Sequence, residues 1–400
     1  MELVLFDLFT VLLIAADMSN YGKQITPLTI LGGVYTALIN LNNLVLHRVY
    51  SFVLVDSKAL WVIFSFYIVI FLVDFLGGQL YRRSKHCDFS YSIRFKSYGA
   101  VTGLFIVGVA AYSLQFILLY HSYGLNNIKG KNGGILGHLT SLAFILGPVA
   151  LDLALKTKRK LKIILAGGLN LAVLAINVAF GGKYVIFINL TYFLLYFILK
   201  RNKRANLMKM IKIVFPLAMI AVAAFVILYY VIPRATGHYQ STLDFAIKHM
   251  FYYLVGSITA NNYTMLHAGQ GDVLTPFTVI ANIAKALVGN HEYVNPIYPF
   301  VFPVDSVTYT NVSGFLGETV YDLGIMGAYL YTAFIFGIVN FFYYQYRNNN
   351  KFYLAFCYSN AITAFLFFCN FYSVSGIVLP LMLAIALDVF SFFRVGKFHI

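Results

Sequence analysis

Charged residues are scarce in this chain, and acidic ones are the scarcest. The 400 residues include 14 Asp and Glu against 29 Lys and Arg, and charged residues make up 11% of the total while 60% are hydrophobic. A soluble domain usually carries about 25% charged residues. The shortage of charge therefore argues against a soluble protein and directs attention to the apolar runs.

Cysteine is also rare, with only Cys87, Cys357 and Cys369 in the whole sequence. Three widely separated cysteines are too few for a disulfide framework, and we expect Cys357 and Cys369 to be buried packing residues. No CxxC, HExxH or Walker pattern is present, so the sequence supports neither a zinc site nor an ATP-driven activity. We predict a protein without metal or cofactor.

Apolar runs of transmembrane length recur along the whole sequence. A helix needs about 20 apolar residues to cross the hydrocarbon core, and a backbone in lipid must satisfy its own hydrogen bonds. The runs do not alternate as the strands of a membrane barrel do. We therefore predict an all-α, polytopic integral membrane protein with about 11 transmembrane helices, forming a single membrane domain over residues 1–400. The predicted spans are 3–17, 27–48, 58–80, 97–120, 138–155, 163–180, 184–199, 213–232, 325–346, 352–371 and 375–393.

The net charge of +15 is unevenly distributed. Positive residues form short clusters between apolar runs, for example at 82–96, 156–162 and 200–212. Such clusters are typical of cytoplasmic loops under the positive-inside rule. They indicate membrane topology and contact with anionic lipids, and they do not indicate a nucleic-acid partner.

One long segment, residues 233–324, is predicted on the opposite side of the membrane. Its charges are of both signs, unlike those of the cytoplasmic clusters. Long loops tend to be functional, and we expect this one to be partly helical. "STLDFAIKHMFYYLVGSI" has amphipathic spacing, with Phe245, Met250, Tyr253 and Leu254 near one face. "NPIYPFVFP" carries three prolines and cannot form a regular helix.

The end of this loop changes character within one stretch, "NVSGFLGETVYDLGIMGAYLYTAFIFGIV". It begins with polar residues and becomes a long apolar run. Charged groups at the mouth of a membrane helix are costly, so Glu318 and Asp322 need a reason to be there. They are four residues apart and would share one face of a helix. Either could accept a proton, or Asp322 could instead favour the helix N-terminus electrostatically.

This stretch resembles the late motif of Wzy-type polymerases, the O-antigen or oligosaccharide repeat-unit polymerases of bacterial envelopes. Asn311, Asp322, Gly324 and Gly327 match that pattern. An earlier stretch, "NVAFGGKYVIFINLTYFLLYFILKRNK", resembles the small-Gly-basic turn of the family, with Lys183 where Arg is common. The plan of about 11 helices with a large external loop between late helices is also similar.

The resemblance implies a metal-independent, integral-membrane glycosyltransferase of the bacterial inner membrane, with its active site facing the periplasm. Such an enzyme transfers the growing chain, with inversion, from undecaprenyl pyrophosphate to a new lipid-linked repeat unit. The implied partners are these lipid-linked oligosaccharides, membrane lipids and a chain-length-regulating co-polymerase.

Cations are needed to hold the diphosphate and to stabilise the charge that develops as it leaves. We select Arg234, at the outer end of the span 213–232, and Lys183, at an outer turn between two spans. The positive-inside rule predicts few cations on the outer side of the membrane, so a cation there suggests a function such as substrate binding. Each side chain could instead simply extend to lipid headgroups.

A proton acceptor is needed for the attacking sugar hydroxyl, and His238, Glu318 and Asp322 are the candidates. His238 lies four residues from Arg234, close enough to share a site. Asn311 would orient a sugar or phosphate oxygen. The predicted sugar-stacking residues are the loop tyrosines Tyr239, Tyr293, Tyr298 and Tyr309.

Two other functions remain open. A flippase for lipid-linked sugars should carry charges in the middle of its helices, whereas here most lie outside or near helix ends. An O-antigen ligase usually carries a His shortly before the Asn of the late motif. Tyr309 and Thr310 occupy that place, which makes a ligase the weaker alternative.

Overall fold

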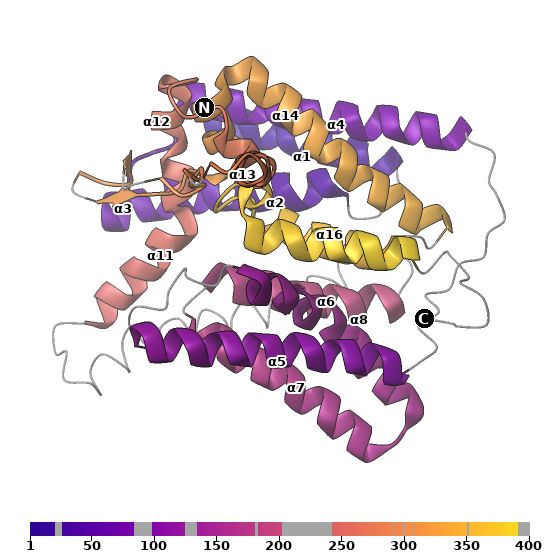
Figure 1. The fold of residues 1–400 in the computed structure, drawn as a ribbon. Coiled ribbons are helices and arrows are strands. Elements are labelled where there is room, and N and C mark those ends of the chain that lie inside the picture. Colours follow the sequence, from indigo (N-terminus) through magenta and orange to yellow (C-terminus); the bar gives the residue numbers. More distant parts are fainter. Residues whose placement is uncertain are drawn as a thin grey trace. The chain divides into compact units, whose positions relative to one another are not determined.

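Helices dominate the computed structural model of this protein (Figure 1). The structure describes residues 1–20, 26–83, 98–124, 134–180, 183–201, 242–290, 292–298, 301–306, 308–349 and 352–390. Within these ranges the strands form one antiparallel pair, β1 (Phe302–Pro303) against β2 (Tyr309–Thr310). The all-α prediction is therefore confirmed.

The chain divides into two compact units. The first comprises Met1–Leu80, Arg204–Asn340 and Thr363–Ser373, and the second comprises Tyr81–Lys203, Phe341–Ile362 and Val374–Ile400. The sequence-based expectation of a single membrane domain stays a prediction.

The first unit holds the N-terminal helices, the described part of residues 233–324 and most of α14. Its elements are α1 (Glu2–Asn20), α2 (Pro27–Asn40), the π-helical η1 (Leu41–Leu46), α3 (His47–Tyr50), most of α4 (Ser57–Arg83), α11 (Leu243–Thr259), α12 (Asn261–Leu266), η4 (Thr275–Phe277), α13 (Thr278–Leu287), most of α14 (Gly314–Asn349) and η5 (Phe371–Ser373). The β1–β2 pair also belongs to this unit.

The second unit is built from the middle helices and the C-terminal ones. Its elements are α5 (Tyr98–Tyr123), α6 (Gly134–Thr157), α7 (Lys160–Ala179), α8 (Lys183–Arg201), most of α15 (Tyr353–Phe365) and α16 (Ser375–Phe390). Buried hydroxyl groups join these helices. Tyr192 on α8 donates to the carbonyl of Ile145 on α6 at 3.0 Å, and Tyr112 on α5 donates to Asn177 on α7 at 2.7 Å. Such pairing is needed where no water can replace a missing partner.

Six helices in the described residues are long and apolar enough to cross a membrane. They cover Pro27–Tyr50, Ser57–Leu80, Tyr98–Tyr123, Leu136–Thr157, Lys160–Ala179 and Gly314–Tyr346. The structure is therefore compatible with a multi-pass membrane protein. The predicted total of about 11 spans stays a prediction, and the span 213–232 lies outside the described residues.

The predicted span 352–371 is wrong at its C-terminal end, because α15 ends at Phe365. The chain then leaves the helix, and the carbonyl of Leu366 accepts the backbone N–H of Phe315 at 2.7 Å. The first N–H groups of a helix have no partner within it. The segment after α15 supplies partners to the start of α14, which explains why the helix stops early.

The amphipathic helix predicted in the long loop is confirmed as α11. Thr242 caps it by accepting the backbone N–H of Phe245 at 3.0 Å. Of the apolar residues predicted near one face, Met250 is buried whereas Phe245 is 49% exposed. Ala246 and Val255 of the same helix are also buried.

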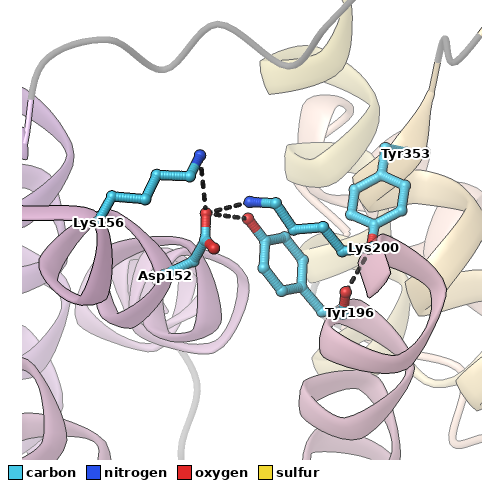
Figure 2. Close-up of polar contacts among 5 residues, drawn as sticks. All are labelled: Asp152, Lys156, Tyr196, Lys200 and Tyr353. Carbon is cyan, nitrogen blue, oxygen red and sulfur yellow. Dashed lines mark hydrogen bonds and ion pairs between the residues drawn. The ribbon is translucent and has the colours of Figure 1, made fainter. Parts of the chain in front are cut away.

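A cluster of two lysines around the buried Asp152 joins α6 to α8 in the second unit. Figure 2 shows the Asp152 carboxylate facing the ammonium groups of Lys156 and Lys200 and the hydroxyl of Tyr196. Lys156 is four residues further along α6, with 3.4 Å between the charged atoms. Tyr353 on α15 donates to the carbonyl of Tyr196. This arrangement neutralises a carboxylate that would otherwise be costly to bury.

Candidate active site at the break in helix α14

Helix α14 is interrupted at Gly324, whose φ of 68° and ψ of 171° are not helical. A positive φ is easy for glycine and strained for other residues. Helix carbonyls normally accept from the amide four residues later, so a break frees carbonyls of the preceding turn. The carbonyl of Val320 accepts the N–H of Gly269 at 3.0 Å, and that of Tyr321 accepts the N–H of Gly271 at 2.8 Å. Residues 269–271 therefore dock onto α14 at this break.

Gly271 is the point of closest approach between this loop and α14. A Cβ atom at residue 271 would lie 2.8 Å from Cδ1 of Tyr321 and closer still to Oδ1 of Asp322. Real Cβ atoms do not come that near to another heavy atom, so any larger residue must push the loop away. The glycine thus brings backbone directly against the Asp322 carboxylate.

Asp322 is buried, with 1% of its surface exposed, and its Oδ1 accepts a hydrogen bond from the hydroxyl of Tyr298. Tyr298 comes from the proline-rich stretch before β1. Burial raises the pKa of the Tyr298 phenol above its usual range, and the negative charge of Asp322 raises this pKa further. The phenol therefore keeps its proton and acts as a donor to the carboxylate.

Aromatic side chains surround this pair. We call Tyr263, Tyr298, Phe302 and Tyr321 the aromatic cluster. The rings of Tyr298, Phe302 and Tyr321 contact one another edge to face at 5.5–5.7 Å between centroids, and Tyr263 contacts Phe302 at 5.9 Å. Phe302 is fully buried, while the three tyrosines are partly exposed. Tyrosine offers an apolar ring and a polar hydroxyl together, which suits a ligand with apolar faces and many hydroxyl groups.

Glu318 lies one turn before Asp322 and is 3% exposed. Its Oε1 accepts the backbone N–H of Ser313 at 3.3 Å, and its Oε2 accepts that of Asn370 at 2.7 Å. The carboxylate thus fastens the segment after α15 to the beginning of α14. This geometry favours a structural role for Glu318 over proton transfer to a substrate.

Tyr309 and Asn311, two predicted substrate-binding residues, lie just before α14. Tyr309 belongs to β2, is 49% exposed, and accepts the hydroxyl of Tyr252 at 2.6 Å through its carbonyl. Asn311 follows β2 and is partly exposed. The first unit therefore holds Tyr309, Asn311, Glu318 and Asp322 together, and their proposed roles stay predictions.

The predicted cationic residues are not tested by this geometry. Lys183 begins α8 in the second unit, and its side chain lies outside the described part of the structure. Arg234 and His238 fall outside the described residues altogether. One described cation of the long loop, Lys248, is paired with Asp305 at 3.5 Å.

Sequence reasoning missed His267 and its neighbour Tyr263. Their rings stack at 4.0 Å between centroids with 19° between their planes. The signal was present, since the two residues are four apart in a helical stretch and the turn "HAGQGD" follows. The contact of Gly271 with α14 was not predictable, because it joins segments about 50 residues apart.

Comparison with known proteins identifies no relative of this chain. No family model matches the chain, and no curated protein or solved structure matches it. The resemblance to Wzy-type polymerases therefore rests on the sequence motifs alone.

Proposed function

We propose that this protein is an integral-membrane glycosyltransferase that polymerises lipid-linked oligosaccharide repeat units. The growing chain moves from undecaprenyl pyrophosphate to the non-reducing end of a new lipid-linked unit, with inversion at the anomeric carbon. The observation that carries the proposal is the buried Asp322–Tyr298 pair at the Gly324 break, with the aromatic cluster around it.

The chemistry of a glycan substrate supports this choice. Sugar rings present apolar faces to aromatic side chains and hydroxyl groups to carboxylate and phenol groups. Asp322 and Tyr298 supply the polar groups, and Tyr263 and Tyr321 supply further partly exposed rings. Ligand sites commonly combine aromatic lining with a few placed polar groups.

The proposed reaction joins two sugars without an oxidant, a reductant or a metal. An acceptor hydroxyl loses its proton and attacks the anomeric carbon of the donor. The bond from that carbon to the diphosphate oxygen breaks, and the diphosphate leaves with the electron pair. Arg234 and Lys183 are the residues we propose to stabilise the leaving diphosphate.

The topology we propose places this chemistry on the outer side of the membrane. About 11 spans would cross the bacterial inner membrane, and residues 233–324 would face the periplasm. The apolar part of α14 leads from the Gly324 break towards Arg347, which forms a short pair of positive residues with Lys351 in the sequence. The positive-inside rule places such clusters in the cytoplasm and the break at the opposite end.

A transporter of lipid-linked oligosaccharides is the second candidate. It is favoured by Asp17 on α1 and Asp74 on α4, which are both fully buried and close enough for their charges to interact. Carboxylates inside membrane helices often mark ion or substrate pathways. An O-antigen ligase is the remaining alternative, and the following experiment separates a polymerase from both of these.

Polymer length measured on a gel distinguishes these functions. The gene is deleted in its native strain and restored as the wild type, with membrane levels matched. A ladder that collapses to a single capped repeat unit on deletion, and returns with the wild type, supports a polymerase. Loss of the single-repeat product as well would contradict it and point to a flippase or a ligase. A chain-length-regulating partner would be indicated by a restored ladder whose length distribution depends on a second protein.

A further inference from the structure

His267 is held in a defined orientation beside the aromatic cluster. Its Nδ1 lies 2.8 Å from the backbone carbonyl of Tyr263, and its ring stacks on the Tyr263 ring at 4.0 Å. A carbonyl oxygen can only accept a hydrogen bond, so Nδ1 must carry the proton. In the neutral imidazole the other nitrogen, Nε2, then carries a lone pair. The fold thus selects the tautomer that can accept a proton at Nε2.

The chain after His267 leads directly to Asp322. Gly269 and Gly271 donate backbone hydrogen bonds to α14 at the turn that contains Asp322. The ring of Tyr263, which carries the His267 stack, lies 6.3 Å from the ring of Tyr321. His267 is therefore fixed on one side by α12 and on the other by the glycine loop, and it is itself partly exposed.

We propose that His267 is the proton acceptor of the glycosyl transfer, an inference that rests on the proposed function. As the acceptor hydroxyl attacks the anomeric carbon, its proton passes to Nε2 of His267. The electrons of the broken carbon–oxygen bond leave with the diphosphate, and the imidazolium later returns the proton to solvent. Asp322 and Tyr298 bind sugar hydroxyl groups beside this residue.

Imidazole suits this role better than the carboxylate of Glu318, because both oxygens of Glu318 already accept hydrogen bonds from backbone N–H groups. It is the side chain whose charge ordinarily changes between about pH 5 and 8, where such a reaction must run. The other titratable groups of this region are Tyr263 on α12, Tyr321 and Asp322 on α14, and Tyr298 and Asp272 in the loops. Of these groups, the Tyr298 phenol has its pKa raised by burial, so it keeps its proton and does not compete as the base.

The test measures polymer formation by the purified full-length protein in liposomes, with a synthetic lipid-linked repeat unit as substrate. The variants are His267→Gln and His267→Ala. The matched control is His47→Gln, because Nδ1 of His47 also lies 2.7 Å from a backbone carbonyl, that of Phe52, but on α3. Rates are measured from about pH 5 to 8, the range in which imidazole titrates.

We expect both His267 variants to lower the turnover number about 100-fold or more, since general base catalysis is commonly worth that much. The wild type should lose activity towards acid pH, because a general base must be unprotonated to act, and the residual activity of His267→Gln should lack this loss. His47→Gln should keep the wild-type rate and pH profile. A general disturbance of the fold would not remove the acid limb of the profile selectively.

Two results would overturn the inference. One is a His267→Gln enzyme with a rate within about twofold of the wild type, the other a reduced rate with an unchanged acid limb. Failure of the proposed function looks different, because the wild-type protein itself would then form no polymer from the lipid-linked unit.

Discussion

Asp322 in the first unit and Asp152 in the second are both buried carboxylates, but their surroundings differ. Asp152 faces the ammonium groups of Lys156 and Lys200 (Figure 2). Asp322 instead accepts from the phenol of Tyr298. Two ammonium groups satisfy a carboxylate electrostatically. One phenol supplies a single hydrogen bond and leaves acceptor capacity for a ligand. Burial alone therefore does not identify a functional acid. The number and charge of its hydrogen-bonding partners determine whether a buried carboxylate can still bind a ligand.

Glu318 sharpens this contrast because it lies on the same helix as Asp322. Both of its oxygens accept backbone N–H groups, those of Ser313 and Asn370. It holds two segments of the first unit together, as Asp152 holds two helices of the second. Of these three buried acids, Asp322 is the one we assign to the substrate.

Among the predictions on the surroundings of these buried acids, the largest effect concerns the approach of the loop to Asp322. Gly271→Ala should lower polymer formation about 100-fold, because the new Cβ displaces the loop and a misplacement of about 1 Å can cost that much. The control is Gly337→Ala on the same helix α14, where a Cβ meets nothing within 4 Å. Rates are compared in liposomes at equal protein. Equal rates for the two variants would contradict the claim that the Gly271 loop forms part of the active site.

A smaller effect is expected from removing the tyrosine hydroxyl that donates to Asp322. Tyr298→Phe removes the donor to Asp322 and should lower the rate about 10-fold, which corresponds to the loss of one hydrogen bond of about 1.4 kcal/mol. The matched change, Tyr196→Phe, removes a hydroxyl 3.5 Å from Asp152 and should leave the rate unchanged. The comparison would fail if Tyr196→Phe proved the more damaging of the two.

The smallest effect on activity is expected at Glu318, where stability should change instead. Glu318→Gln replaces one acceptor oxygen by an amide donor and leaves a buried N–H group without its partner. Thermal unfolding in detergent should show a loss of about 1–3 kcal/mol, while the rate per folded molecule stays within about twofold. Glu292→Gln, at an exposed residue, is the control. Normal stability with lost activity would return Glu318 to the role of a catalytic acid or base.

The helical architecture could be predicted from sequence because the lipid environment leaves few alternatives. Apolar runs gave the position of α4 to within a few residues, and the amphipathic stretch gave α11. The end of α15 could not be predicted. Residues after Phe365 are as apolar as those before it. The end of α15 is explained only by the hydrogen bonds that the next residues make to the start of α14, about 50 residues earlier in the sequence.

The candidate site was predictable only in part, for a similar reason. Spacing placed Glu318 and Asp322 on one helix, but it could not tell a structural carboxylate from an available one. That distinction depends on Asn370 and Tyr298, which come from other segments. The positive φ of Gly324 likewise depends on the loop that docks there.

The most direct test of the central claim compares Asp322→Asn with Asp152→Asn in the liposome polymerisation assay. Asparagine keeps the size of the side chain and can still accept from Tyr298, but it removes the carboxylate. We predict that Asp322→Asn forms no polymer while Asp152→Asn forms it at nearly the wild-type rate per folded molecule. A full-length polymer from Asp322→Asn, at the wild-type rate, would contradict the account.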